Sequence, residues 1–242
     1  DSLFTHYFPK AVDGYLAMSH AVYADIEKFV KNPCRRFTPH PIYDHYGSKC
    51  DKNVAAKKLN LDPSVNYLLF FGFIRSYKGV DLLLQALADE RLSEFNCKVI
   101  VAGEFYEDEK YYYDLEKKLG LKGRVIWYPS FIPDGEVAPY FNVADMVILP
   151  YKSATQSGVA QIAYHFEKPM VVTNVGGLPE IVPHKKVGFV VDVNPKAIAT
   201  AIAGFYTETN SLNFEAGIAE EKKKYEWTKL TQSFMELFNE TS

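Results

Sequence analysis

Two basic side chains lie three residues apart in the glycine-flanked segment Gly72-Phe-Ile-Arg75-Ser-Tyr-Lys78-Gly79. The apolar run 66–71 precedes this segment and an amphipathic stretch follows it, so the segment joins a predicted strand to a predicted helix. A helix N-terminus offers free N–H groups and partial positive charge, arginine can grip a phosphate through two parallel hydrogen bonds, and lysine acts as a point charge. Arg75 and Lys78 therefore form either an anion site or a pair of solvated surface cations.

Two other strand exits carry small and hydroxylic residues. The run 145–149 is followed by Thr155-Gln156-Ser157-Gly158-Val159, which leads into a predicted helix. Gly158 would let a phosphate approach the backbone closely, but a serine or threonine N-cap without a ligand would produce the same pattern. The pair Gly176-Gly177 likewise fits either close backbone approach or a plain turn.

Several other kinds of chemistry are not indicated. No strand is followed by G-x-G-x-x-G or by a P-loop pattern, which argues against nicotinamide and P-loop chemistry. The three cysteines form no zinc pattern, no Asp-x-Asp pair ends a predicted strand, and we expect no metal. Cys97 lies in an apolar run and is expected to be buried, while His40, His45 and His165 are expected to be structural or exposed. The cysteine usage favours a reducing, intracellular setting.

The composition is that of a soluble globular protein. Of the 242 residues, 48% are hydrophobic and 24% charged. The net charge of −3 lacks the basic excess typical of duplex-DNA binding, so we expect no nucleic-acid partner. The longest apolar runs fall short of the ~20 residues that a membrane span needs.

Short apolar runs alternate with amphipathic stretches along the chain. Runs that are apolar at consecutive positions are typical of parallel strands covered on both faces, which predicts a doubly wound parallel α/β sheet. In such sheets ligands bind at the carboxyl ends of the strands. The predicted strands are 14–18, 66–71, 97–102, 124–128, 145–149, 169–173 and 188–191. The predicted helices are 20–31, 80–87, 107–119, 135–142, 156–166, 195–206 and about 216–238.

The first fifty residues predict a domain boundary. Prolines interrupt residues 32–53, and proline disfavours both helices and central strands, so we expect a linker there. The single βα unit before it cannot bury its own faces and is expected to be the tail of a preceding domain, in a chain that is part of a longer protein. The expected parts are residues 1–31, 32–53, 54–208 and 209–242.

Taken in order, five motifs resemble the carboxy-terminal half of family 4 (group 1) glycosyltransferases, which have the GT-B fold. The resemblance covers roughly residues 60–207. Residues 12–19 are similar to the end of that family's amino-terminal domain, and the helix with Trp227 to the carboxy-terminal helix that returns towards it. The motifs are the segment from Phe71 to Gly79, Val101-Ala-Gly103-Glu104, Phe131-Ile132-Pro133, Leu149-Pro-Tyr151, and the segment from Lys168 to Ile181.

The resemblance implies a Rossmann-like domain that binds a UDP- or GDP-linked sugar, and a retaining transfer reaction without a metal or cofactor. The missing amino-terminal domain would bind a glycan or lipid-linked acceptor. The resemblance also implies polysaccharide biosynthesis and a cytoplasmic location, with peripheral membrane contact through the missing half left open. By position, Arg75 and Lys78 would hold the diphosphate and stabilise the leaving group. The other residues implied to meet the donor are Gly72, Glu104, Phe131, Ile132, Gln156, Ser157, Gly158, Val159 and Gln161.

The chain departs from the family in one place. The family carries two glutamates eight residues apart around the helix that here begins near Gln156, whereas this chain has no glutamate there before Glu167. Gln161 could accept hydrogen bonds from ribose hydroxyls without charge, and the absence of the other glutamate bears on sugar identity and activity. Two alternatives therefore stay open: a non-catalytic binding domain, and a nucleotide-sugar epimerase, for which no cluster of carboxylates and histidines is predicted. We expect the 242-residue chain to bind a nucleotide sugar without transferring the sugar alone.

Overall fold

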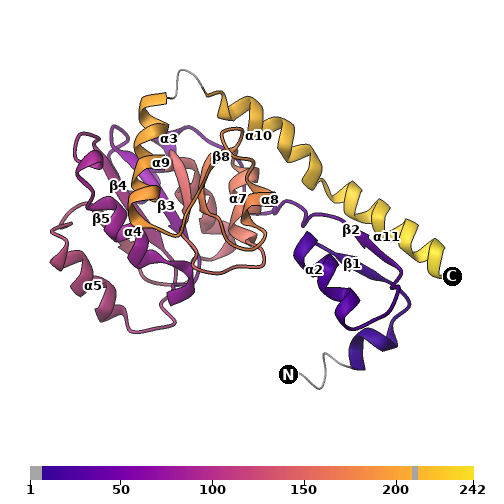
Figure 1. Cartoon of the computed structure of the whole chain (residues 1–242). Helices are drawn as coiled ribbons and strands as arrows, with labels where there is room; N and C mark the ends of the chain where they lie inside the picture. The colour runs from indigo at the N-terminus through magenta and orange to yellow at the C-terminus, as the bar shows by residue number, and fades with distance from the viewer. Residues whose placement is uncertain (1–6, 209–211) are drawn as a thin grey trace. The chain divides into compact units, whose positions relative to one another are not determined.

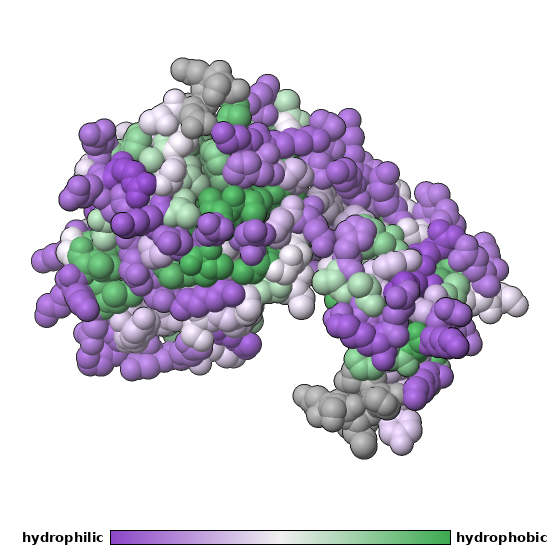
Figure 2. All heavy atoms as spheres, in the orientation of Figure 1, coloured by the Kyte–Doolittle hydropathy of each residue, from purple (hydrophilic) through white to green (hydrophobic). Residues whose placement is uncertain are grey.

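The computed structural model describes residues 7–208 and 212–242 (Figure 1). It divides into two compact units. The larger unit is Tyr43–Glu220, and the smaller combines Asp1–Ile42 with Glu221–Ser242. The face shown in Figure 2 is mainly hydrophilic, with apolar patches between the hydrophilic residues. None of the described helices is long and apolar enough to cross a bilayer.

The larger unit is built on a six-stranded parallel sheet, which confirms the predicted fold class. Its spatial order is β5-β4-β3-β6-β7-β8. Strands β3 and β4 pair in register from Asn66 with Cys97 to Phe71 with Ala102. The strands are β3 (Asn66–Phe71), β4 (Cys97–Ala102), β5 (Val125–Tyr128), β6 (Met146–Leu149), β7 (Met170–Thr173) and β8 (Gly188–Val191).

Consecutive burial explains why these strands could be predicted. Every residue of β6 is buried, as is every residue of β3 after Asn66, so both faces of the sheet are covered. Removing a Val, Leu, Ile or Phe side chain from water contributes about 1.5–3 kcal/mol, which makes this central pair of strands the core of the unit. Cys97 is buried as expected.

Helices connect the strands of the larger unit. Helix α4 packs against α5 and α9, and α3 packs against α6. Helices α3 and α8 were not predicted: α3 presents only small apolar residues, Ala55 and Ala56, to the core, and α8 is a single turn. The helices are α3 (Lys52–Leu59), α4 (Val80–Leu87), α5 (Glu109–Lys118), α6 (Val137–Val143), α7 (Gly158–His165), α8 (Leu178–Ile181) and α9 (Pro195–Glu208).

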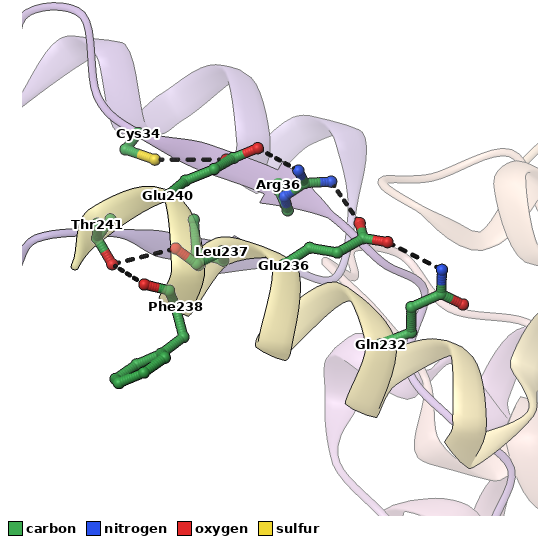
Figure 3. Close-up of polar contacts among 8 residues, drawn as sticks. All are labelled: Cys34, Arg36, Gln232, Glu236, Leu237, Phe238, Glu240 and Thr241. Carbon is green, nitrogen blue, oxygen red and sulfur yellow. Dashed lines mark hydrogen bonds and ion pairs between the residues drawn. The ribbon is translucent and has the colours of Figure 1, made fainter.

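The smaller unit contains a two-stranded parallel sheet, β1 (Tyr15–Ala17) and β2 (Arg35–Phe37), with α2 (His20–Asp25) between the strands. Helix α11 (Trp227–Thr241) packs on both strands. Arg36 on β2 donates to Glu236 at 2.7 Å and also pairs with Glu240 one turn later, which fixes the helix to the strand (Figure 3).

Two local predictions were wrong. Strand β2 lies inside the stretch that was expected to lack strands, because Pro33 and Pro39 stand outside it and leave its pairing with β1 intact. The helix expected at about 216–238 is interrupted between α10 (Phe214–Lys222) and α11. There the carbonyl of Tyr225 accepts from the Ile42 N–H at 2.9 Å, and Glu226 is extended with a ψ of 140°.

Candidate functional site

A cavity of about 890 Å³ opens in the larger unit at the carboxyl edge of the sheet. The segments that follow β3, β4, β5 and β6 all contribute to its wall, together with residues that precede α3. This is the edge at which ligands of open α/β sheets bind. Nine predicted residues line the cavity: Gly72, Lys78, Glu104, Phe131, Ile132, Gln156, Ser157, Gly158 and Val159.

Lys78 contributes a lysine ammonium to the cavity wall. It ends the 3-10 turn η3 (Ser76–Lys78), directly before α4. A side chain on Gly72 would place its Cβ 3.3 Å from the Lys78 Nζ, and Gly72 has a φ of +95°, so glycine provides both the turn and the space. Burial, reinforced by the charge of Arg75, lowers the pKa of Lys78 to about 8. The ammonium is therefore partly dehydrated and close to a second cation.

Arg75 does not line the cavity. Its guanidinium carbon lies 4.5 Å from the ring centroid of Tyr106, in a cation–π contact. Within the described ranges, neither Arg75 nor Lys78 forms an ion pair with a carboxylate. The loop that carries them lies next to Glu107, which follows β4: the backbone N–H and the hydroxyl of Ser76 lower the pKa of this carboxyl.

The β6–α7 loop forms the wall beside Lys78. The Ser157 Oγ accepts from the Ala160 N–H at 3.4 Å and caps α7, so the N-cap alternative is present in the structure. The hydroxyls of Tyr151 and Ser157 lie 3.4 Å apart. Gln156, Gly158 and Val159 still face the cavity, which leaves the first turn of α7 beside any bound ligand. The segment that contains the capping Ser157 thus also forms part of the cavity wall.

The glycine pair after β7 has a packing role. Gly176 has a φ of +50°, and a Cβ there would lie 1.5 Å from the carbonyl oxygen of Ala154. Gly177 donates its N–H to the carbonyl of Thr155 at 3.2 Å. The pair therefore closes against the cavity loop and does not itself line the cavity.

Gln161 is separated from the other predicted site residues. Its side chain is 1% exposed, and among the described residues its amide oxygen and nitrogen have no hydrogen-bond partner. Ile162, the next residue of α7, lines the cavity instead. The structure thus brings an apolar side chain to the wall where the sequence predicted an amide.

The opposite side of the cavity is acidic and apolar. Glu104 follows β4, and Phe131, Ile132 and Asp134 follow β5. The Phe131 side chain is 60% exposed. Because the strands lie in the order β5-β4-β3-β6, the two carboxylates occupy one half of the cavity while Lys78 and the serine–glycine loop occupy the other. The cavity therefore has an anion-accepting half and a half that accepts hydrogen-bond donors.

Among the cavity residues that the sequence reasoning missed, three come from the segment before α3. Tyr43, His45 and Tyr46 lie in the stretch expected as a linker, yet all three line the cavity. The His45 Nε2 is 4.0 Å from the Asp134 Oδ2, so the cavity holds one histidine–carboxylate pair although the sequence predicted no cluster of this kind; His45 is exposed, as expected. The high density of aromatic residues between Pro41 and Gly47 was the available signal. Within the described ranges, no group of three or more His, Cys, Asp or Glu residues is arranged to hold a metal ion.

Known proteins resemble this chain in sequence. The family model for glycosyl transferases group 1 matches residues 51–224. A D-inositol 3-phosphate glycosyltransferase from Segniliparus rotundus is 32% identical over 145 residues, 59% of this chain and 32% of the relative. An enzyme of the same name from Corynebacterium urealyticum is 27% identical over 223 residues, 89% of this chain and 49% of the relative. The chain thus spans from one third to one half of the length of these relatives.

Solved structures share the fold. Sucrose-phosphate synthase from Thermosynechococcus elongatus superposes with a TM-score of 0.81 at 18% identity, over 98% of this chain and 60% of that one. HepE from Anabaena, solved in complex with UDP-glucose, gives a TM-score of 0.76 at 18% identity, over 95% and 64%. These likenesses confirm the predicted GT-B fold. Since the family model covers well over half of the sequence, the chain belongs to the group 1 glycosyl transferases.

Proposed function

We propose that the chain is the donor-binding part of a retaining glycosyltransferase that uses a UDP- or GDP-linked sugar. The observation that carries this proposal is Lys78 at the carboxyl edge of the sheet, beside the capped start of α7: it is half-buried and has no carboxylate partner among the described residues. A partly dehydrated cation without a carboxylate partner suits a site that receives an anion. In this proposal residues 54–208 are the donor domain, 1–31 the end of an acceptor domain, 32–53 the linker and 209–242 the returning carboxy-terminal segment.

The charge pattern of the cavity orients the donor. A diphosphate is attracted by Lys78 and the free N–H groups of α7, and is repelled by Glu104 and Asp134. Ribose hydroxyls and the N–H groups of a base are hydrogen-bond donors, which carboxylates accept. We therefore place the diphosphate over β3 and β6 and the nucleoside over β4 and β5.

The same orientation explains leaving-group stabilisation. When the bond between the sugar and the diphosphate breaks, negative charge develops on the phosphate oxygen that leaves. Preorganised donors aimed at such developing charge lower the barrier. Lys78 contacts this charge in our proposal, and Arg75, which is held on Tyr106 outside the cavity, adds a second positive charge nearby. The acceptor and the sugar would meet at the open side of the cavity.

The relatives support this choice over the alternatives. Those described above are named as glycosyltransferases, and HepE was solved with UDP-glucose. An epimerase needs an acid–base pair beside the sugar. His45 and Asp134 are residues of the right chemical types for such a pair, but they lie in the half of the cavity that we assign to the nucleoside. Turnover by the full-length protein would distinguish an enzyme from the non-catalytic alternative.

The test is a calorimetric titration of the chain with UDP, GDP and their glucose and mannose conjugates, with and without EDTA. We expect one nucleotide series to bind with equal affinity in both buffers, because Lys78 supplies the positive charge. Failure of every nucleotide to bind would contradict the proposal, and loss of binding in EDTA would contradict its metal independence. Sugar transfer by the 242-residue chain alone would contradict the predicted need for a separate acceptor domain.

A further inference from the structure

We propose that Tyr43, His45 and Tyr46, here called the aromatic strap, recognise the nucleobase of the donor and clamp it against Phe131. This inference rests on the proposed function and adds a recognition element to it. All four side chains line the same cavity, although the strap comes from the segment before α3 and Phe131 from the end of β5.

The strap begins at the phosphate half of the cavity. A Cβ on Gly158 would lie 3.0 Å from the ring of Tyr43, so the tyrosine ring packs directly on the first residue of α7. Any larger residue at position 158 would push this ring away. The contact fixes where the strap enters the cavity.

The strap ends at the nucleoside half. The His45 Nε2 lies 4.0 Å from the Asp134 Oδ2, and the rings of His45 and Tyr46 are 4.2 Å apart at an angle of 36°. The ring of Tyr46 also meets that of Tyr43 edge-on at 6.1 Å. The three rings therefore form one connected wall that spans both halves of the cavity.

The backbone after the strap is tied down. The carbonyl of Gly47 lies 2.6 Å from the His165 Nε2, and the carbonyl of Ser48 accepts from the Asn142 side chain at 3.1 Å. The same asparagine accepts from the Cys50 N–H at 3.0 Å. A wall held in this way is preorganised, so little ordering entropy is lost when a planar ligand stacks on it.

Phe131 supplies the second face. Its large apolar side chain is 60% exposed in a cavity wall, where it gains little from burial in the free protein. A planar base between Phe131 and the His45–Tyr46 pair would cover it. Glu104 and Asp134 at the same half can accept the N–H groups of the base edge, which adds hydrogen bonds to the stacking.

The experiment compares ligands that carry different parts of the donor. Wild type, Tyr46→Ala, Phe131→Ala, the double variant Tyr46→Ala/Phe131→Ala and Tyr46→Phe are titrated by calorimetry with UDP, GDP, UDP-glucose, UMP, GMP and inorganic pyrophosphate. Tyr111→Ala, an exposed tyrosine on α5 outside the cavity, is the matched control. Circular dichroism verifies folding.

We expect Tyr46→Ala and Phe131→Ala each to weaken the nucleotides about tenfold, a typical stacking loss, and to leave pyrophosphate unchanged. Tyr46→Phe should retain most of the affinity because it keeps the ring. The double variant Tyr46→Ala/Phe131→Ala should lose less affinity than the product of the two single losses, since both residues hold one base.

Three results would overturn the inference: unchanged nucleotide affinity in Tyr46→Ala, an equal loss for UDP and pyrophosphate, or a loss confined to UDP-glucose relative to UDP. The last would assign the strap to the sugar. A wild-type chain that binds no nucleotide would overturn the proposed function, and this inference with it, whereas nucleotide binding that is indifferent to the strap overturns the inference alone.

Discussion

Lysines at the two edges of the parallel sheet have different partners. At the amino edge a second cavity, of about 880 Å³, is lined by Lys49, Lys52 and Lys168. The Lys52 Nζ lies 2.8 Å from the Asp145 Oδ1, and Lys49 pairs with Glu167. At the carboxyl edge Lys78 has no carboxylate partner among the described residues.

Lys168 and Lys78 make the comparison sharper. Burial lowers the pKa of both, but Asp145 opposes this shift at Lys168, whereas the charge of Arg75 adds to it at Lys78. Positive charge is therefore largely compensated in the amino-edge cavity, as it is at Lys152, whose Nζ lies 2.8 Å from the Asp81 Oδ2, whereas the charge of Lys78 has no carboxylate partner among the described residues. Two cavities of similar volume thus differ in the property that matters for binding an anion, and only the cavity at the carboxyl edge is expected to bind the donor.

The largest expected effect comes from removing the charge at each edge in turn. Lys78→Met should weaken UDP or GDP about ten- to a hundredfold, because hydrogen bonds to charged groups contribute about 1.5–3 kcal/mol. Lys52→Met at the amino edge should leave the affinity unchanged. Calorimetry on both variants measures this, and similar losses in the two would break the comparison.

Arg75 should matter less than Lys78, since it does not line the cavity. We expect Arg75→Ala to weaken UDP or GDP up to about tenfold, because a positive charge near the diphosphate is lost, and Arg75→Lys to recover only part of the loss, because an ammonium does not reproduce the planar contact with Tyr106. The loss should be larger for the diphosphate than for the free nucleoside. An unchanged affinity in a folded Arg75→Ala variant would assign Arg75 to the surface.

The control for that experiment is Lys122→Ala, an exposed cation just before β5. Arg124, which the sequence also places away from the carboxyl edge, is less suitable. Its guanidinium donates to the carbonyls of Leu87 at 2.9 Å and Leu92 at 3.1 Å, so its removal would alter folding.

The pH dependence of binding should report Lys78. Its pKa of about 8 lies below that of an exposed lysine, so the free protein loses this charge as the pH rises through 8. A bound diphosphate favours the protonated form, and UDP affinity should fall by up to about tenfold per pH unit above 8. The unliganded fold should change in the opposite direction and gain stability between pH 8 and 10, because the folded state holds fewer protons than the unfolded one.

Titrations between pH 7 and 10 measure the first effect and denaturation curves the second. Both should be absent in Lys78→Met. In Arg75→Ala the decline of affinity should begin at higher pH, because the neighbouring charge that lowers the pKa is gone. A decline that persists unchanged in Lys78→Met would assign the titration to another group.

The amino edge should show its role in stability and not in binding. Asp145 pairs with Lys52 and also accepts from the Tyr67 N–H at 2.7 Å at the start of β3. Asp145→Ala leaves both groups without this partner, and we expect the free energy of unfolding to fall by about 1–3 kcal/mol. Chemical denaturation measures the loss. UDP affinity at a temperature where the variant is folded should match wild type, and a large change in it would contradict the separation of the two edges.

The sheet and its binding edge could be predicted because they depend on local pattern. Strands buried on both faces appear in the sequence as continuous apolar runs, and the loops that bind ligands in parallel sheets follow those runs. Asn66–Phe71 and Gly188–Val191 were predicted to the residue on this basis. Lys78 and Gly158 followed from their places at strand exits.

The rest depends on contacts between distant residues. The packing of the Tyr43 ring on Gly158 joins positions more than a hundred residues apart, and such a contact produces no periodic pattern in the sequence. Which of Gln161 and Ile162 faces the cavity depends on the rotation of α7 by a single residue, and the start of this helix was predicted two residues too early and its end one residue too late. Arg75 was placed in the right loop, but its position on Tyr106 requires the neighbouring strand exit.

A crystal structure of the chain with UDP would test the central claim most directly. We predict diphosphate oxygens at about 2.7–2.9 Å from the Lys78 Nζ, the usual length of a charge-assisted hydrogen bond, with the uracil beside Phe131. If GDP is the nucleotide that binds, the same positions apply to its diphosphate and guanine. Diphosphate on the Glu104 and Asp134 side, or nucleotide in the amino-edge cavity, would contradict the account.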